Sequence, residues 1–479
     1  MKKMLKRSLA AVLALVMILG VCACSDKKGK VDSDVPVLTW YVPGDAQPDL
    51  PRVLEEANKI VEPAIGAKID IQFIDQSSYA ERVQMMMASR TEFDLMLTGY
   101  VNKFPDAIQK GGLMPITDIV KEHAPKIYNA LPDYAWKASS SDGEIYAIPN
   151  QQIWARSMAF ALRKDLVEKY NFDTSKVKTI DDVEEFWKLV QKNDPEIIPA
   201  YLSMSEDPNT VNKYESISSD VVLNRETGKL EIAPMGEDYE TLANTRREWY
   251  KKGYLRKDIA TAVNQEADLR AGRFASWFVV YKPGVELEKQ LATGHEWIMI
   301  PFMKPYVMKY AINATMTGVS STSKHPVESV KFIELINDNV ELYRLIAHGI
   351  EGVHYEKISD NVIRFIDGSG YKPNADWKFG NQFNAYVVEG KPEDVWEQTK
   401  KMNDEAEISP LIGFSFVPTN VATEITQVAT IKNKFTFGAG TMDVKENLGK
   451  YRQQLKQAGI EKILAEIQKQ VDEYNKTVK

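Results

Sequence analysis

The chain has 479 residues, a formal net charge of −7 at pH 7 and only two cysteines. An acidic chain of this kind is not expected to bind nucleic acid, because phosphate binding needs a basic surface. Its length favours two domains and a buried core large enough to be stable without disulfide bonds.

The first residues predict an export signal with a site for lipid attachment. Basic residues at positions 2, 3, 6 and 7 precede an uncharged stretch from Ser8 to Val21, which is the order of a secretory signal peptide. The stretch is about fourteen residues long, short of the roughly twenty that a membrane-spanning helix needs. Val21 and Ala23 stand before Cys24 as in lipoprotein signal peptides. An ordinary secretory signal with incidental cysteines is the alternative.

These features predict a lipoprotein signal peptide over residues 1–23, lipidation of Cys24 and a flexible tether over residues 24–36. The lipid would hold the chain on the extracytoplasmic face of the cell membrane. Cleavage before Cys24 leaves a single cysteine, which is acylated, so no intramolecular disulfide is expected.

The next segments alternate between strand and helix patterns. Short apolar or alternating runs predict strands, and amphipathic runs with capping residues predict helices. In chain order the predicted elements are a strand over Val37–Val42, a helix over Leu50–Val61, a strand over Ala67–Ile74, a helix opened by Ser78 and a strand over Phe93–Leu97. This alternation predicts an α/β domain with a parallel sheet covered by helices on both faces.

A second alternating region follows Pro149, and the chain then returns to the first domain. The predicted elements are strands over Met158–Leu162, Trp277–Tyr281 and Trp297–Pro301, a helix from about Thr179, a returning strand over Tyr310–Thr315, a helix begun by Pro326, a helix ending at His348 and an amphipathic tail from Lys445. The tail is expected to dock on a lobe, because its apolar residues form one stripe.

Several segments together resemble the extracellular solute-binding proteins of ABC importers, in the carbohydrate-type family and its LipO-like subgroup. The segments that carry the resemblance are EFDLMLTG (Glu92–Gly99), GGLMPITDIV (Gly111–Val120), DGEIYAIP (Asp142–Pro149), RKDLVEKY (Arg163–Tyr170), GVSSTSKHPVESVKFIELIND (Gly318–Asp338), HGIEGVHYE (His348–Glu356), FGNQF (Phe379–Phe383), GFSFVPTNVATEI (Gly413–Ile425) and AGIEKILAEIQKQVDEY (Ala458–Tyr474). Their order and spacing run through nearly the whole exported chain.

The resemblance implies a two-lobed α/β fold of the periplasmic-binding-protein type, with hinge strands and a C-terminal helical module. The N-terminal lobe is predicted over residues 37–149 with a returning segment at about 309–355, and the C-terminal lobe over 150–308, completed by 356–479. Ligand is expected between the lobes, beyond the carboxyl ends of the strands.

The function that the resemblance implies is capture of a carbohydrate, expected to be an oligosaccharide, and its delivery to the membrane-embedded permease subunits of an ABC transporter. A monomer without a cofactor is expected. Motifs of the HExxH, GxSxG, Walker and GxGxxG types are absent from the sequence, so an enzyme is not expected. A different solute, such as a peptide or a metal, and a surface glycosidase with a carboxylate pair are the alternatives.

A sugar site needs flat aromatic faces and polar groups around them. Residues at strand ends or in loops are therefore the candidates for ligand binding, and they are Trp40, Tyr41, Asp94, Tyr100, Trp154, Arg156, Trp277, Trp377 and Asn381. Of Trp40 and Tyr41, one is expected to face the core and the other the cleft, because strand residues alternate.

Two of these assignments have a structural alternative, and one further group of residues has metal-like spacing. Arg156 could bind two hydroxyls or a carboxylate, or form a salt bridge between the lobes. Asp94 lies inside a strand, where burial requires a partner. The spacing of His348, Glu351 and His354 could hold a metal, but Gly349 and Gly352 would break the helix, so a loop is the expected structure.

Overall fold

A computed structural model describes residues 35–201, 211–259, 266–432 and 443–477. The predicted signal peptide, Cys24 and all but the last two residues of the predicted tether lie outside these ranges. Residues 37–479 form one compact unit, and the description below concerns this unit.

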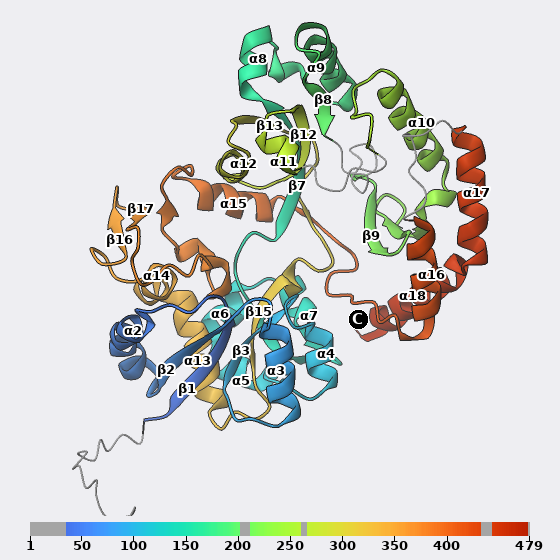
Figure 1. Cartoon of the computed structure of the whole chain (residues 1–479). Helices are drawn as coiled ribbons and strands as arrows, with labels where there is room; N and C mark the ends of the chain where they lie inside the picture. The colour runs from blue at the N-terminus through green and yellow to red at the C-terminus, as the bar shows by residue number, and fades with distance from the viewer. Residues whose placement is uncertain (1–34, 202–210, 260–265, 433–442, 478–479) are drawn as a thin grey trace, which may run out of the picture. The chain divides into compact units, whose positions relative to one another are not determined.

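The first lobe is built on a five-stranded sheet (Figure 1). Its strands, in spatial order, are β2 (Lys68–Ile74), β1 (Val37–Pro43), β3 (Leu95–Gly99), β15 (Thr315–Val319) and β6 (Ala147–Pro149). Strands β1, β2 and β3 are parallel, as their alternation with helices predicts. The returning strand β15 is antiparallel to β3 and β6, so the prediction of a wholly parallel sheet is wrong.

Helices cover both faces of this sheet, and each face has its own core. On one face α2 (Leu50–Ile65), α13 (Pro326–Asp338) and α14 (Val340–His348) pack together over Leu38, Trp40 and Val42 of β1. On the other face α3 (Tyr79–Ala88) and α4 (Phe104–Gln109) pack over Met96 and Leu97 of β3. Both sets of alternate strand residues are therefore buried, as expected for a sheet between two helical layers.

The second lobe has a mixed sheet centred on β7 (Ala155–Arg163). Strand β7 pairs antiparallel with β12 (Phe274–Tyr281), β13 (Trp297–Pro301) and β14 (Tyr306–Val307), and β12 pairs parallel with β8 (Ile198–Tyr201). Helix α9 (Ile180–Asn193) begins at a capping box formed by Thr179 and Asp182, and its Phe186 and Trp187 enter the core. Helices α8 (Lys164–Tyr170) and α12 (Val285–Thr293) complete this lobe.

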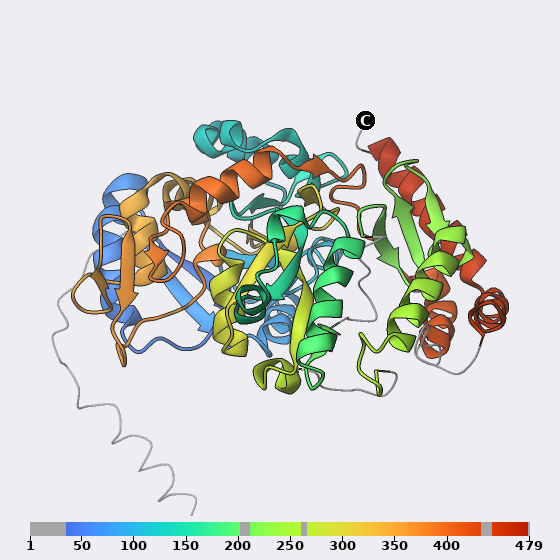
Figure 2. The same cartoon turned by 90° about the horizontal axis from the view of Figure 1, so that it is seen from above.

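A third group of elements packs around a core of its own and combines strands and a helix from the middle of the chain with helices from its C-terminal part. It contains an antiparallel sheet of β9 (Tyr214–Ser218), β10 (Val221–Asn224) and β11 (Leu230–Ile232), and the helices α10 (Glu237–Lys251), α16 (Ala422–Lys432), α17 (Val444–Gln457) and α18 (Ile460–Thr477). Figure 2 shows α16, α17 and α18 beside α10 and these strands. Leu448, Ile463 and Ile467 belong to their shared core, which explains the apolar stripe of the tail.

The segment after α14 corrects one predicted lobe assignment. The prediction placed everything after residue 355 in the C-terminal lobe. However, Ala375 and Phe379 belong to the same core as Trp40 and Phe332, and the hydroxyl of Tyr371 donates to the carbonyl of Ile346 at 2.6 Å. Apolar burial therefore holds this segment on the first lobe. Among the helices that the structure describes, none combines the length and the apolar character needed to cross a membrane.

Candidate ligand-binding site

The carboxyl edge of the first sheet is where the chain leaves three parallel strands. Strands β1, β2 and β3 end at Pro43, Ile74 and Gly99, and β15 starts beside Gly99, because Thr315 is its register partner. Gly99 has φ +124°, and a Cβ there would lie 2.3 Å from the carbonyl oxygen of Asn313. The backbone before β15 thus lies directly on the end of β3. Ligands of open α/β sheets bind at such an edge.

Lys378 lies at one part of this edge. Its Nζ donates to the carbonyl of Pro43 at 2.6 Å and to Oε1 of Gln76 at 3.3 Å, so it joins the ends of β1 and β2. The side chain is buried, and this burial lowers the pKa of Lys378. Its Nζ also lies 4.8 Å from the ring centroid of Trp377, which is half-buried. The result is an aromatic ring held beside a cation at the sheet edge.

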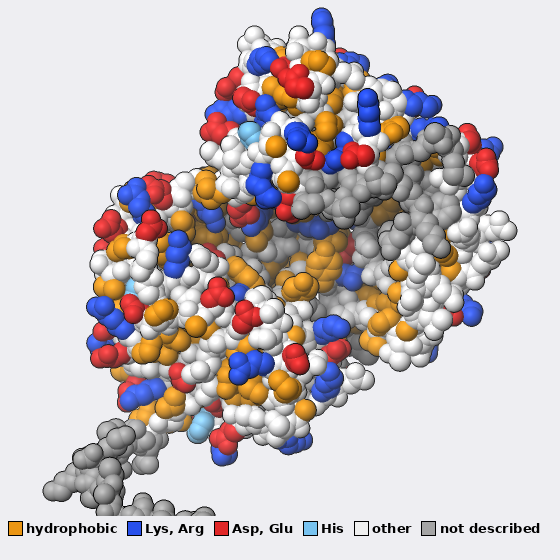
Figure 3. All heavy atoms as spheres, viewed as in Figure 1, with side chains coloured by type: hydrophobic (Ala, Val, Ile, Leu, Met, Phe, Trp, Pro, Cys, Tyr) orange, Lys and Arg blue, Asp and Glu red, His pale blue; other side chains and the backbone are white. Residues whose placement is uncertain are grey.

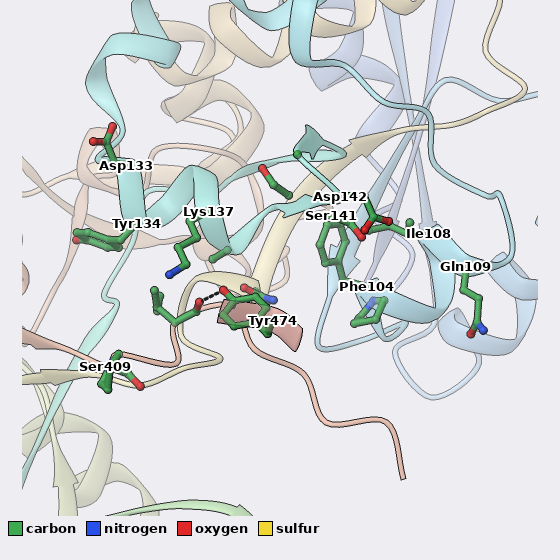
Figure 4. A pocket seen from close by; sticks show the side chains of 18 residues that line it. Phe104, Ile108, Gln109, Asp133, Tyr134, Lys137, Ser141, Asp142, Ser409 and Tyr474 are labelled. Carbon is green, nitrogen blue, oxygen red and sulfur yellow. Dashed lines mark hydrogen bonds between the residues drawn. The ribbon is translucent and has the colours of Figure 1, made fainter. Parts of the chain in front are cut away.

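A pocket of about 860 Å³ lies further along the same edge (Figure 4). Its walls come from α4, from α7 (Asp133–Ala138), from the turn between β4 (Ser140–Ser141) and β5 (Glu144–Ile145), from Asn313 and from the chain around residues 409–413. Side chains that line it are Phe104, Ile108, Gln109, Asp133, Tyr134, Lys137, Ser141, Asp142, Ser409 and Tyr474. Figure 3 shows a hollowed face of the molecule in which hydrophobic side chains gather.

Aromatic and polar groups alternate in this pocket. Tyr134 and Lys137 are three residues apart on α7 and therefore share a face of that helix. Lys137 takes part in none of the ion pairs within the described ranges, and its Nζ lies 5.4 Å from the ring centroid of Tyr474. Asp133 and Asp142 are exposed at the rim. One lysine and two aspartates give the lining residues a net charge of −1, so the pocket disfavours an anionic ligand and suits one with an apolar face and hydroxyl groups.

The crossing between the lobes is held by Asn403 of α15 (Val395–Asp404). Its Oδ1 accepts from the backbone N–H groups of Trp154 and Ala155, each at 2.9 Å, and its Nδ2 donates to the carbonyl of Gln152 at 2.8 Å. These bonds satisfy backbone groups of Gln152, Trp154 and Ala155 where the chain passes from β6 into β7. A second crossing runs from β14 to β15.

The structure corrects the assignment of Trp40 and Tyr41. Trp40 is 1 % exposed and packs edge-on against Phe332 and Phe379, with ring centroids 5.6 and 5.9 Å away. Tyr41 points to the opposite face and packs edge-on against Phe93 at 5.4 Å. Neither ring faces a cleft, because helices cover both faces of the sheet.

Asp94 and Asn381 are occupied by backbone and side-chain contacts. Asp94 precedes β3 and so lies at the opposite edge of the sheet, where it accepts from the N–H of Thr39 at 2.9 Å and from the hydroxyl of Ser323 at 2.6 Å. Asn381 accepts from the N–H of Phe383 at 3.2 Å and donates to the carbonyl of Asn337 at 3.3 Å. Both side chains join segments of the first lobe, so the structure corrects their assignment to the ligand.

The candidates just before β7, in β7 and in β12 are packed within the protein. Trp154 is buried at the crossing and donates from its indole to the carbonyl of Asn150 at 3.0 Å. Trp277 packs edge-on against Tyr201 and Trp297. Arg156 has no ion pair within the described ranges, and its Nε is buried without a hydrogen-bond partner there. The salt bridge between lobes that was the alternative for Arg156 is not seen in this part of the chain.

Tyr100 and Trp377 are the predicted residues that lie at the carboxyl edge of the first sheet. Tyr100 directly follows β3, is 82 % exposed, and donates its N–H to the carbonyl of Ala314 at 3.2 Å.

Sequence reasoning missed Lys378, Lys137 and Tyr474. The spacing of Tyr134 and Lys137 was a readable signal on α7, but no local pattern connects them with residue 474.

His348, Glu351 and His354 do not come together as ligands. The Nε2 of His348 accepts from the N–H of Tyr386 at 3.2 Å, whereas His354 accepts at Nδ1 from the N–H of Ile350 at 2.8 Å and faces Asp49 with Nε2. In the part of the chain that the structure describes, no group of three or more histidine, cysteine, aspartate or glutamate side chains could hold a metal ion.

Two family models and several known proteins are similar to this chain. Residues 53–339 match the family model described as bacterial extracellular solute-binding protein, and residues 410–476 match a domain of unknown function (DUF3502). A carbohydrate ABC transporter substrate-binding protein of Streptococcus pneumoniae serotype 4 is 29 % identical over 506 residues, with 100 % of each chain covered. The polygalacturonan/rhamnogalacturonan-binding protein YtcQ of Bacillus subtilis is 24 % identical over 73 % of each chain.

A solved structure with the same architecture is the N-glycan transport solute-binding protein NgtS of Streptococcus pneumoniae. It superposes with a TM-score of 0.79 at 27 % identity, covering 93 % of this chain and 100 % of that one. The complex of that protein with Man5GlcNAc gives a TM-score of 0.61 at 27 % identity and covers 93 % of this chain and 99 % of that one. The family model covers more than half of the chain, and the chain therefore belongs to the family of bacterial extracellular solute-binding proteins.

Proposed function

We propose that this protein captures an oligosaccharide at the carboxyl edge of the first sheet and delivers it to an ABC permease. The observation that carries the proposal is the pocket of about 860 Å³, in which tyrosine rings lie beside a lysine, serines and an asparagine. Such a lining suits sugars, which have an apolar face and a rim of hydroxyls. Similarity over the whole chain to a carbohydrate ABC transporter substrate-binding protein supports it.

Delivery requires that the permease distinguish the loaded from the empty protein. Two lobes joined by crossings can close around a ligand, and the ligand favours the closed form only if it binds that form more tightly. Asn403 and the crossing at residues 150–155 lie where such a rotation would act. The proposal includes action as a monomer and no enzymatic turnover.

The proposal also includes attachment of the protein to the membrane through lipid on Cys24. Lipid on Cys24 would hold the receptor close to a permease in the same membrane, and residues 25–36 would leave it room to open and close. Growth of the producing cells with an alkyne fatty acid is expected to label the wild-type protein and not a Cys24→Ala variant, which would appear in the medium. Equal labelling of both proteins would rule out Cys24 as the lipid site.

Calorimetry of residues 25–479 tests the ligand class. The panel should contain Man5GlcNAc, Man1GlcNAc, maltohexaose, an oligogalacturonate and a peptide of similar mass. A single-site isotherm with a neutral sugar and no change of that sugar in chromatography is the expected result. Binding of the peptide alone would favour a different solute, and hydrolysis of the sugar would favour a glycosidase.

Trp377→Ala is expected to weaken binding of that sugar by more than tenfold while the unfolding midpoint stays unchanged. The ring is half-buried and held at the sheet edge by Lys378, so its loss removes a binding face without opening a core cavity. Trp277→Ala serves as the matched control, because Trp277 is half-buried but packed against two aromatic rings of the second lobe. Equal affinity of wild type and Trp377→Ala would remove Trp377 from the site.

A further inference from the structure

We infer that the C-terminal module, residues 410–476, forms one wall of the sugar pocket and binds the terminal unit of a neutral oligosaccharide. The module matches a domain of unknown function. This inference rests on the proposed function and assigns a binding role to the module. Four observations within the described residues support it, and they concern Gly413, Tyr474, Glu215 and the pocket lining.

Gly413 places the start of the module directly on α7. The residue has φ +82°, and a Cβ there would lie 2.7 Å from Cα of Ala138 and 3.0 Å from the hydroxyl oxygen of Tyr474. Its N–H donates to the carbonyl of Lys309 at 2.7 Å. Close approach of this kind needs glycine, because a side chain would separate the two segments. The module therefore contacts the lobe that carries the sheet edge.

Tyr474 brings the last helix of the module to the pocket (Figure 4). Its hydroxyl donates to the carbonyl of Ile412, and its ring centroid lies 5.7 Å from that of Phe414. Burial raises the pKa of Tyr474 to about 12, so the hydroxyl remains a donor at neutral pH. Lys137 of α7 lies 5.4 Å from the ring centroid. One aromatic ring from the module and one cation from the first lobe therefore meet across the pocket.

Glu215 ties this wall to the crossing strands. The carboxylate of Glu215 is buried and accepts from the hydroxyl of Tyr306 at 2.8 Å, from the hydroxyl of Ser409 at 2.7 Å and from the N–H of Lys309 at 2.7 Å. Tyr306 belongs to β14, which leads into β15, and Ser409 lines the pocket. The carboxylate of Glu215 therefore joins the crossing strand to Ser409 of the pocket lining, beside the backbone bond from Ser409 to Val307.

The lining indicates which part of a ligand fits. Tyr134 and Tyr474 offer aromatic faces for the apolar side of a sugar ring, and Lys137, Ser141 and Asn313 offer polar groups for its hydroxyls. The side-chain oxygen of Asn313 has no hydrogen-bond donor among the described residues. A volume of about 860 Å³ is that of a pocket for a small ligand, so it holds the end of an oligosaccharide while the rest follows the sheet edge.

The test compares four variants of residues 25–479 by calorimetry with the neutral sugar of the panel that binds most tightly. Tyr474→Ala and Lys137→Met are expected to weaken binding tenfold or more. Tyr474→Phe keeps the ring and is expected to stay within threefold of wild type. Glu461→Ala is the matched control, because Glu461 is exposed on the same helix and does not line the pocket. Thermal unfolding of each variant shows whether it is folded.

The outcomes separate the two proposals. Wild-type affinity in folded Tyr474→Ala and Lys137→Met overturns the role of the module while oligosaccharide binding stands. If Tyr474→Ala does not fold, Lys137→Met alone decides, because Lys137 is half-buried on α7 and takes part in none of the ion pairs within the described ranges. Absence of sugar binding by the wild-type protein overturns the proposed function, and the role of the module falls with it.

Discussion

Replacement of Trp40 by alanine is expected to lower the free energy of unfolding by about 3–5 kcal/mol. The side chain is 1 % exposed and packs edge-on against Phe332 and Phe379. Its removal leaves a cavity where β1, α13 and the segment around Phe379 meet. The indole N–H has no hydrogen-bond partner among the described residues, so the loss is one of apolar packing. Urea unfolding followed by circular dichroism measures it.

The same experiment distinguishes a core role from a ligand role for Trp40. Trp40→Phe keeps most of the packing and is expected to lose less stability than Trp40→Ala. Folded Trp40→Ala at low temperature should bind sugar with nearly wild-type affinity, because its ring does not reach the pocket. A stable Trp40→Ala protein that no longer binds sugar would instead return Trp40 to the binding site.

Acid is expected to destabilise the protein through His348. The imidazole is 2 % exposed among Tyr355, Phe365 and Tyr386, and its Nε2 accepts from the N–H of Tyr386. Burial is the main cause that lowers the pKa of His348 from 6.5 to about 4; the attraction of Asp376 opposes this shift and the charge of Arg344 adds to it. Protonation would place a charge in an aromatic core and break the bond at Nε2.

The direction of the pH effect follows from these two pKa values. In the unfolded chain the imidazole takes up a proton near pH 6.5, and in the folded chain only near pH 4. Between these values the unfolded state holds more protons, so the free energy of unfolding falls as the pH is lowered from 7 to 4. The contribution of His348 is about 3 kcal/mol, is complete above pH 7 and does not change further below pH 4.

His348→Gln isolates this contribution from that of the many carboxylates. A glutamine can accept from the N–H of Tyr386 but carries no charge in acid. The difference in unfolding free energy between wild type and His348→Gln should therefore shift by about 3 kcal/mol between pH 7 and pH 4, in favour of the variant at low pH. A difference that stays constant over this range would show that His348 is not buried as a neutral imidazole.

Local patterns in the sequence predict the elements of the first lobe well. The apolar run of β1, the alternation in β2 and the proline that begins α13 each depend on neighbouring residues alone. Strand β13, from Trp297 to Pro301, has the predicted bounds for the same reason. The antiparallel direction of β15 was missed, because strand direction depends on how the long connection over residues 150–314 returns to the sheet.

The candidate site was predictable only in its general place. Parallel strands predict a site at their carboxyl ends, and Tyr100 and Trp377 lie at that edge. Each was chosen from its own neighbouring residues, and neither choice showed that the two lie at one edge. Alternation along a strand could not decide between Trp40 and Tyr41, because it gives opposite faces and does not show that both faces are covered. Asp94 was placed inside a strand predicted over Phe93–Leu97, whereas β3 begins at Leu95, so the residue lies before the strand at its amino end.

The sequence by itself determined that this is an acidic chain with alternating strands and helices and the order of segments of a solute-binding protein, and it predicts an export signal at the start. Only the tertiary structure decided which side chains meet at the sheet edge. Lys378 reaches the end of β1, and Tyr474 reaches Lys137, across more than 300 residues of chain. Contacts of this kind arise from burying apolar faces of distant segments together, and no local periodicity records them.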